Sequence, residues 1–356
     1  MTNFPDMVTQ YGGVPLGGHP VYPRTGVPGQ RIVYFVDGNN GSDDSEGHTW
    51  HEARATIQSA VTSANSAKHA LDNVDILVAN GYYEETVQIT RAGTELTETA
   101  MLWQNMGYNC GYIGTLRLIA GAGVHNAGHV KWTCGTTATT PPLYIGRPNV
   151  EIHGFNIQEN SDETTTAGLW GDSDEMSGHA QISMPAILCE DEYNGETIGT
   201  LLHGAGNNVL IKNCRINSAG VLNSGAKWIN VEDCILEYGE YGVAMIANSK
   251  GRASESTVRR CQFSQKTYDI IHGYAVTCWV DDCRFSSSPT THIFPLAAHA
   301  ASELCVVSNS HGFTEAVWNG TNNAKNAGWA MQNCSDTTAG GGVSNAAMNN
   351  SANNKP

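Results

Sequence analysis

The chain has 356 residues, of which 40% are hydrophobic and only 15% charged, and its formal net charge is −15 at pH 7. This composition excludes a collagen, a coiled coil and a charge-rich disordered chain. We expect no nucleic-acid partner, because 34 acidic residues against 19 basic ones would repel a phosphate backbone. We also expect no membrane partner, because the sequence has no apolar run of about 18 residues that could form a spanning helix.

The first thirty residues are rich in proline and glycine. Their five prolines are spaced too closely for a helix or a central strand, so residues 1–30 are predicted to form an extended arm. The segment has neither a basic region nor an apolar one after it, so we expect no signal peptide. Folding in a cytoplasm would leave the cysteines as free thiols.

The next segment, residues 31–73, is predicted to hold a strand (31–37) and a helix (53–67). In that helix Ile57, Ala60, Val61 and Ala64 recur at helical spacing and form one apolar stripe. A strand (74–79), a Gly-Tyr-Tyr turn and a further strand (86–89) follow. Between residues 80 and 148 other strand-like runs occur without a clear repeat.

From residue 150 onward the sequence repeats itself, which predicts a solenoid. Seven segments align without gaps, from VEIHGFNI at Val150 to WAMQNCSD at Trp329. Their sixth positions are Phe155, Cys214, Cys234, Cys261, Cys283, Ser310 and Cys334, and from Cys214 onward these lie 20 to 27 residues apart. Each repeat has the length of one coil.

Each column of the repeat predicts a side-chain direction. Three positions before the sixth stands an apolar column, expected to point inward: Ile152, Ile211, Val231, Val258, Val280, Val307 and Met331. Two positions after it, Ile157, Ile216, Leu236, Phe263 and Phe285 are expected to do the same. Directly before it, six of the seven residues are Gly, Asn or Asp, which tolerate a left-handed backbone and predict a recurring bend.

A second strand in each coil aligns less securely around Val221, Val243, Ile270, Ile293 and Val317, which would face inward. The next residues along these strands would then face outward. These are the predicted oligomer-interface residues Leu222, Ala244, Ile271, Phe294 and Trp318. An apolar stripe facing solvent is unusual for a monomer, so it favours lateral association.

Two sequence features resemble the right-handed parallel β-helix proteins of the pectate-lyase-like superfamily. One is the Asn-Cys-x-Ile coil at Asn213 to Ile216, and the other is the entry YFVDGNNGSDDSEG followed by ATIQSAV. The resemblance implies an all-β fold, a right-handed single-stranded parallel β-helix with an N-terminal capping helix. It would occupy residues 74–336, with an acidic insertion at about 159–205 and an Asn/Gly/Ala-rich tail at 337–356.

The insertion concentrates acidic residues, since eleven acids and no lysine or arginine lie between Val150 and Ile211. Asp172, Asp174 and Glu175 could hold Ca²⁺, which takes several oxygen ligands, although a solvated loop explains them as well. No cofactor is required by the sequence. The inward cysteines are interpreted as small apolar fillers, because no Cys-x-x-Cys pair predicts a zinc site.

Catalysis on a polysaccharide requires paired carboxylates or a base with a neutralising cation. The alignment places Asp269 and His292 side by side on adjacent coils of the second strand's outer face, with Glu240 nearby, so these three are the candidate catalytic residues. The aromatic rings of Tyr241, Tyr268 and Trp170 are candidates for stacking on sugars, with core packing as the alternative.

Two functions from different classes are consistent with these features. The absent signal, the arm and the apolar stripe favour a non-enzymatic virion surface protein: a phage capsid decoration, head fibre or tailspike-like β-helix that binds host glycans. Such a protein would form a homotrimer and bind capsid or tail proteins of a virus particle. It would be assembled in the host cytoplasm and lie on the virion surface. The alternative is a polysaccharide lyase or glycoside hydrolase acting on a surface polysaccharide.

Overall fold

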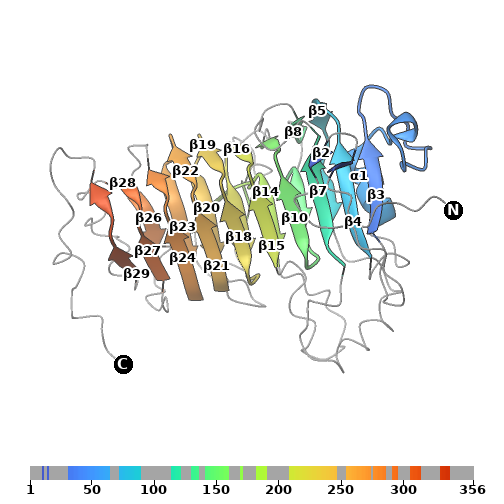
Figure 1. Cartoon of the computed structure of the whole chain (residues 1–356). Coiled ribbons are helices and arrows are strands. Elements are labelled where there is room, and N and C mark those ends of the chain that lie inside the picture. The colour runs from blue at the N-terminus through green and yellow to red at the C-terminus, as the bar shows by residue number, and fades with distance from the viewer. Residues whose placement is uncertain are drawn as a thin grey trace, which may run out of the picture.

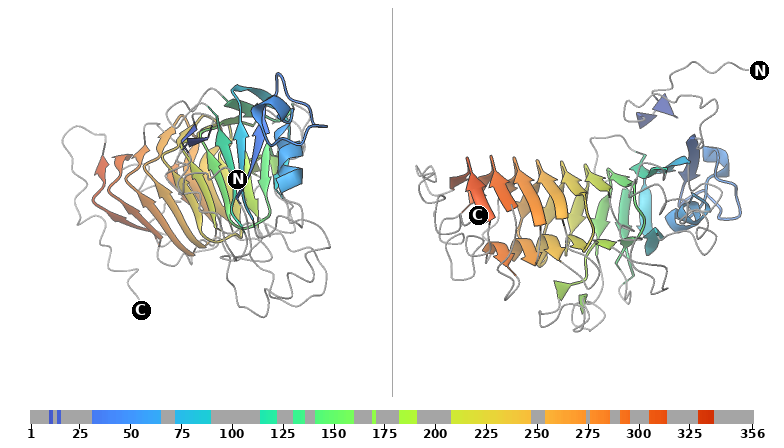
Figure 2. Two further views of the ribbon diagram at one scale, coloured as in Figure 1. Left: turned by 45° about the vertical axis from the view of Figure 1, so that its right-hand side comes forward. Right: turned by 90° about the horizontal axis from the view of Figure 1, so that it is seen from below.

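The computed structural model describes fifteen stretches of the chain. They are residues 10–11, 14–15, 31–64, 72–89, 114–121, 130–135, 141–159, 169–170, 182–190, 208–246, 254–273, 276–285, 291–295, 305–313 and 329–336. Within them the chain is almost entirely β-strand, and the strands of successive coils stack side by side along one axis (Figures 1 and 2). No helix in these stretches has the length and hydropathy needed to span a membrane.

Three parallel sheets run along the stack, each built from one strand per coil. The first sheet has ten strands: β3 (Arg31–Val36), β4 (Asn73–Val78), β7 (Leu116–Ala120), β10 (Val150–His153), β15 (Val209–Lys212), β18 (Ile229–Glu232), β21 (Ser254–Arg259), β24 (Val276–Asp281), β27 (Cys305–Ser308) and β29 (Trp329–Gln332).

The second sheet has nine strands: β5 (Gly81–Glu84), β8 (Val130–Thr133), β11 (Asn156–Gln158), β16 (Arg215–Asn217), β19 (Ile235–Glu237), β22 (Gln262–Ser264), β25 (Arg284–Phe285), β28 (His311–Phe313) and β30 (Ser335–Asp336). The third has seven: β6 (Val87–Ile89), β9 (Leu143–Ile145), β14 (Ile187–Glu190), β17 (Val221–Ser224), β20 (Tyr241–Ile246), β23 (Tyr268–Gly273) and β26 (Thr291–Pro295). Two short antiparallel pairs lie outside the stack: β1 (Gln10–Tyr11) with β2 (Val14–Pro15), and β12 (Leu169–Trp170) with β13 (Ile182–Ser183).

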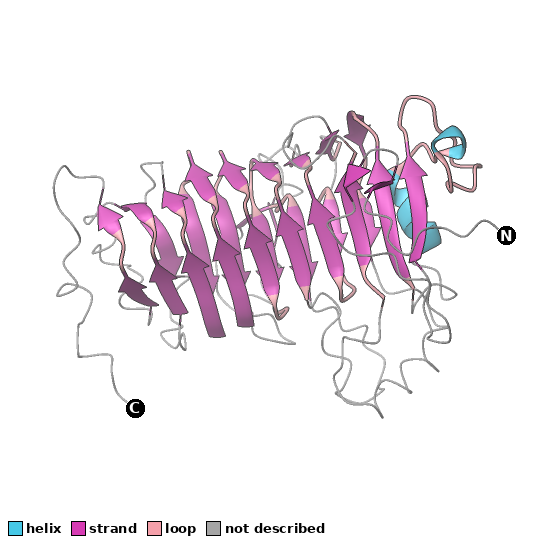
Figure 3. Cartoon of the chain, in the orientation of Figure 1, coloured by secondary structure: helices cyan, strands magenta, loops and turns pink. Residues whose placement is uncertain are grey.

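One helix closes the first coil. Helix α1 (Ile57–Ala64) follows a 3₁₀ turn, η1 (Trp50–Glu52), and lies at the N-terminal end of the stack (Figure 3). Its predicted stripe is fully buried in the main core. The carboxylate of Glu85, from the following coil, accepts the N–H groups of Ile57 and Gln58, and so satisfies donors that a helix N-terminus leaves unpaired. Burial raises the pKa of this carboxyl.

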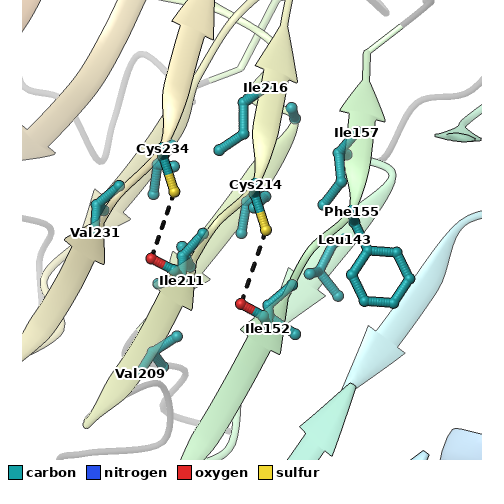
Figure 4. Packing of buried hydrophobic residues seen from close by; sticks show 14 of the residues in the cluster. Leu143, Ile152, Phe155, Ile157, Val209, Ile211, Cys214, Ile216, Val231 and Cys234 are labelled. Carbon is teal, nitrogen blue, oxygen red and sulfur yellow. Dashed lines mark hydrogen bonds between the residues drawn. The ribbon is translucent and has the colours of Figure 1, made fainter. Parts of the chain in front are cut away.

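The inward columns predicted from the repeat are confirmed. In the column expected from Ile152 to Val307 every described side chain is at most 1% exposed, and Ile157, Ile216, Leu236, Phe263 and Phe285 are equally buried. The side chain of Met331 lies outside the described residues. The sixth-position column is buried as well, and Figure 4 shows the thiols of Cys214 and Cys234 pointing at carbonyl groups of the preceding coil.

The predicted bend is present in every repeat. All seven residues before the sixth position have a positive φ, including Arg260 at 51°, a residue type that rarely adopts this conformation. Along this column, the N–H of Asn213 donates to Glu232 O, and the N–H of Asp233 donates to Arg259 O. The bend therefore turns the chain from the first sheet to the second and also holds neighbouring coils in register.

The region from 80 to 148, which the sequence left without a repeat, contributes β5 and β6 of one coil and all three strands of the next coil, β7, β8 and β9. Residues 81–84 are not a turn: they form β5, which pairs with β8 in parallel register and buries Tyr83. Trp132 takes the inward position in β8 and donates its indole N–H to Glu85 O. Because a large aromatic ring fills the interior here, the small-residue pattern of the later coils does not occur.

The nine described cysteines are all buried and none forms a disulfide. Four consecutive coils place Cys214, Cys234, Cys261 and Cys283 in one column, and each Sγ also lies near the carbonyl two residues earlier in its own coil, for example Cys234 Sγ at 3.1 Å from Glu232 O. Burial raises the pKa of the Cys189 thiol. These thiols fill space as small apolar groups with weak donors.

We therefore predict that the native protein is almost inert to thiol reagents. Because a thiol must be exposed and ionised to react, at most one of the ten cysteines, Cys110, should react rapidly with Ellman's reagent before unfolding, and all ten should react in guanidinium. Rapid labelling of two or more thiols in the folded protein would contradict the buried column.

Candidate functional site

The candidate catalytic pair Asp269 and His292 is adjacent but not accessible. Parallel pairing of β23 with β26 brings them together, and His292 Nδ1 lies 2.6 Å from Asp269 Oδ2. Both side chains are fully buried, and the imidazole ring packs edge-on against Phe285 of the core. The predicted adjacency is confirmed, whereas the predicted outer-face position is wrong. The pair cannot contact a polymer outside the coil.

The reason is an irregularity in the third sheet. The register between β20 and β23 matches Tyr241 with Tyr268 and Val243 with Ile270, and passes over Gly242 and Asp269. A Cβ on Gly242 would meet the ring of Phe263 at 2.5 Å, so at this position only a glycine lets the backbone pack directly against the core. As a result the consecutive residues Asp269 and Ile270 both lie on the inside of the coil. The alternation of inward and outward side chains along the strand is interrupted here.

Lys266 is a third buried charge beside this pair. It is 3% exposed, and its ammonium group donates to the carbonyl oxygens of Ser218 and Tyr238 on the two preceding coils. Burial lowers the pKa of Lys266 to about 7, opposed by the nearby carboxylates of Asp269 and Glu237. Asp269, His292 and Lys266 therefore form a buried polar cluster inside the stack. Their hydrogen bonds and burial give them a structural role that needs no catalytic function.

The candidate residues Glu240 and Tyr241 both form hydrogen bonds with Ser183 in β13. The N–H of Ser183 in β13 donates to Glu240 Oε2 at 2.6 Å, and the hydroxyl of Tyr241 donates to Ser183 O at 3.0 Å. Tyr241 is fully buried, so it cannot stack on a sugar; burial raises its pKa. Tyr268 is half-buried and packs against the same apolar cluster. The side chain of Trp170 lies outside the described residues.

The predicted interface column is also buried within one chain. Leu222, Ala244 and Ile271 are at most 2% exposed and form a second apolar cluster on the outer side of the third sheet, together with Leu188, Ala219, Tyr241 and Ile246. The expectation that these three residues face solvent is therefore wrong. The side chain of Phe294 and the whole of Trp318 lie outside the described residues, and the trimer stays a prediction.

The calcium candidates Asp172, Asp174 and Glu175 also fall outside the described residues. Across the described stretches, no group of three or more His, Cys, Asp or Glu side chains is arranged to hold a metal ion.

The outer face of the first sheet is the surface that sequence reasoning missed. One outward column passes through His153, Lys212, Glu232, Arg259, Asp281 and Ser308, which the parallel registers place in consecutive coils. The column beside it passes through Glu151, Leu210, Asn230, Thr257, Trp279 and Val306. These are the outward alternates of the repeated strands, so the alternation itself could have identified them.

Ion pairs run along this face. Arg260 Nε lies 2.6 Å from Asp233 Oδ1, and its Nη2 lies 3.1 Å from Glu232 Oε2. Hydrogen bonds from Arg260 lower the pKa of the Asp233 carboxyl, and those from Ser308 and Asn309 lower the pKa of Asp281. These carboxylates are held ionised, which suits hydrogen-bond acceptors better than proton donors.

Trp279 is the large aromatic side chain within these columns, and it is 54% exposed. Its strand neighbour on the same face is Asp281, which pairs with Arg259 at 3.7 Å, and Thr257 and Val306 lie opposite it on the flanking strands. An exposed indole bordered by fixed acceptors and donors combines an apolar platform with orienting polar groups.

Comparison with solved structures supports the architecture. A pectin methylesterase from Aspergillus niger matches over 90% of this chain and 89% of its own, with 13% identity and a TM-score of 0.50. The fold is a right-handed parallel β-helix. Pectin methylesterase PemA from Erwinia chrysanthemi (78% of each chain, 12% identity, TM-score 0.39) and pectate lyase Pel9A (86% and 75%, 9% identity, TM-score 0.37) are more distant.

No known protein family profile matches the chain, and no curated protein matches its sequence. At these identities the likeness concerns the β-helix fold, so the chemistry of the site is argued from the residues themselves.

We predict that Lys266 gives the fold a measurable pH dependence. An unfolded lysine keeps its proton up to about pH 10.4, whereas folded Lys266 releases it near pH 7. Between these values the unfolded state binds more protons, so the free energy of unfolding rises with pH.

Relative to Lys266→Met, the wild type should gain up to about 1.4 kcal/mol per pH unit across that window. Urea unfolding of both proteins from about pH 7 to 9 measures the difference. Parallel curves for the two proteins would show that Lys266 is protonated in the folded state throughout.

Proposed function

We propose that this protein binds an uncharged polysaccharide along the outer face of the first sheet of its β-helix. The observation that carries the proposal is Trp279, half-exposed on a regular sheet beside Asp281, which accepts hydrogen bonds from Ser308 and Asn309. Sugar rings present apolar C–H faces to an aromatic platform and hydroxyls to carboxylates and guanidinium groups. A solved structure of the same fold is named for its action on pectin, which is in keeping with a polysaccharide ligand.

Charge favours a neutral polymer over an acidic one. The net charge is −15, and the arginines of the face are already paired with acids, as Arg260 is with Asp233 and Glu232. Little uncompensated positive charge is left to attract a polyanion, and the long-range field of the chain repels one. The virion role and the particle partners stay predictions, because neither depends on this surface.

Removing the indole tests the proposal. In affinity electrophoresis through gels that contain xylan, glucomannan, dextran or polygalacturonate, we expect the wild type to be retarded by at least one uncharged polymer and not by polygalacturonate. Trp279→Ala should weaken that retardation by about 30-fold in Kd, the effect of losing a central aromatic contact of about 2 kcal/mol.

Tyr82→Ala is the matched control, because Tyr82 is 56% exposed but lies on the second sheet. It should bind like the wild type. Equal binding by Trp279→Ala and the wild type, or equal weakening by both variants, would refute the assignment of the surface.

A further inference from the structure

A histidine and a glutamate form a pair on the same outer face. Glu151 and His153 are alternate residues of β10, both directed outward, and His153 Nε2 lies 3.0 Å from Glu151 Oε2. Their side chains are 25% and 30% exposed, for His153 and Glu151 respectively. The pair is thus open to solvent on one side and packed on the other, unlike the buried pair of Asp269 and His292.

The flanking strands surround the imidazole with one apolar and one cationic neighbour. In the parallel registers, Ile119 of β7 and Lys212 of β15 stand opposite His153. The ammonium group of Lys212 lies 3.7 Å from Glu232 and 3.6 Å from Asp233, too far for a strong hydrogen bond. Lys212 thus places a positive charge on the strand beside His153.

The pair also lies in line with the proposed platform. Strand order from β10 through β15, β18 and β21 to β24 puts His153 four strand spacings from Trp279, or roughly 19 Å at about 4.8 Å per strand. A polymer stacked on Trp279 and running along the stack would reach His153. The inference rests on the proposed function, because it requires a polysaccharide bound at Trp279.

The hydrogen bond to Glu151 fixes the orientation of the His153 ring and the nitrogen that carries the proton. When Nε2 carries the proton and donates it to the carboxylate, Nδ1 keeps its lone pair and acts as a base. A base oriented by a third group is the arrangement that activates nucleophiles in many hydrolases. In the described coils the register neighbours of His153 are Ile119 and Lys212, which offer no hydroxyl or thiol, so water is the group to be activated.

We propose that His153 is the general base of an ester hydrolase that removes acyl groups from the bound polysaccharide. Nδ1 takes a proton from water while the water oxygen bonds to the acyl carbon. The ammonium group of Lys212 stabilises the negative charge on the acyl oxygen. When the bond from the acyl carbon to the sugar oxygen breaks, the imidazolium returns its proton to that oxygen, and a carboxylic acid and a sugar hydroxyl are released.

The surroundings favour ester hydrolysis over the two reactions expected from the sequence. Cleavage of a glycosidic bond needs a protonated carboxyl as general acid, but Asp233 and Asp281 on this face have lowered pKa values. Elimination needs a sugar acid and cations that neutralise its carboxylate, whereas the net charge of −15 opposes such a polymer. An ester on a neutral sugar requires neither.

Acetate release from acetylated xylan tests the proposal, with para-nitrophenyl acetate as a small substrate. The wild type should release acetate, and His153→Ala should lower kcat by about 100-fold or more, the usual contribution of a general base. Glu151→Gln should lower kcat less and shift the pH profile, because it changes the orientation and charge beside the imidazole. Lys212→Met should lower kcat with little change in KM.

His51→Ala, at an exposed histidine in the first coil, is the control and should match the wild type. Trp279→Ala should raise KM for xylan and leave the small ester unaffected. A wild type that binds an uncharged polysaccharide but releases no acetate, or an active His153→Ala, would overturn the ester hydrolase and leave the proposed binding function standing. Loss of the Trp279 effect on binding would instead refute the binding surface.

Discussion

From β10 onward the stack depends on one backbone constraint, a left-handed residue directly after each strand of the first sheet. From Gly154 to Asn333 this residue turns the chain toward the second sheet within a single step. Its N–H also bonds to the carbonyl at the end of the next coil's strand, as Asp282 does to Ser308 O. The following residue is thereby directed inward, where the first repeat places Phe155 and five of the later six place a cysteine. Bend, register and cysteine column are thus consequences of the same geometry.

Repetition made most of this fold predictable. The bend column and the two apolar columns follow from residue types at fixed spacing, and the structure confirms them where their side chains are described. Arg260 shows that stacking imposes the bend even on an unfavourable residue, held there by Asp233 and Glu232. The earlier coils were not predicted because Trp132 and Tyr83 fill their interior, so the repeat of residue types disappears while the repeat of strands continues.

The candidate site was predicted less well, for two physical reasons. Alternation along a strand gives the side of the sheet but not what covers it, and Leu222 and Ile271 are covered within the chain itself. Alternation also fails where a glycine lets the chain approach the core, and this is why Asp269 is buried beside His292. On the regular first sheet alternation holds. The outward residues Trp279 and His153 were therefore accessible to sequence reasoning, but no residue motif distinguished them from solvated positions.

The most direct test of the account is a crystal structure of the protein with an uncharged oligosaccharide long enough to cover several coils. The account predicts a sugar ring stacked on Trp279, with the chain running across the strands toward His153 and Glu151. A sugar bound on the second or third sheet, with the first sheet's outer face empty, would contradict the central claim that this face is the functional surface.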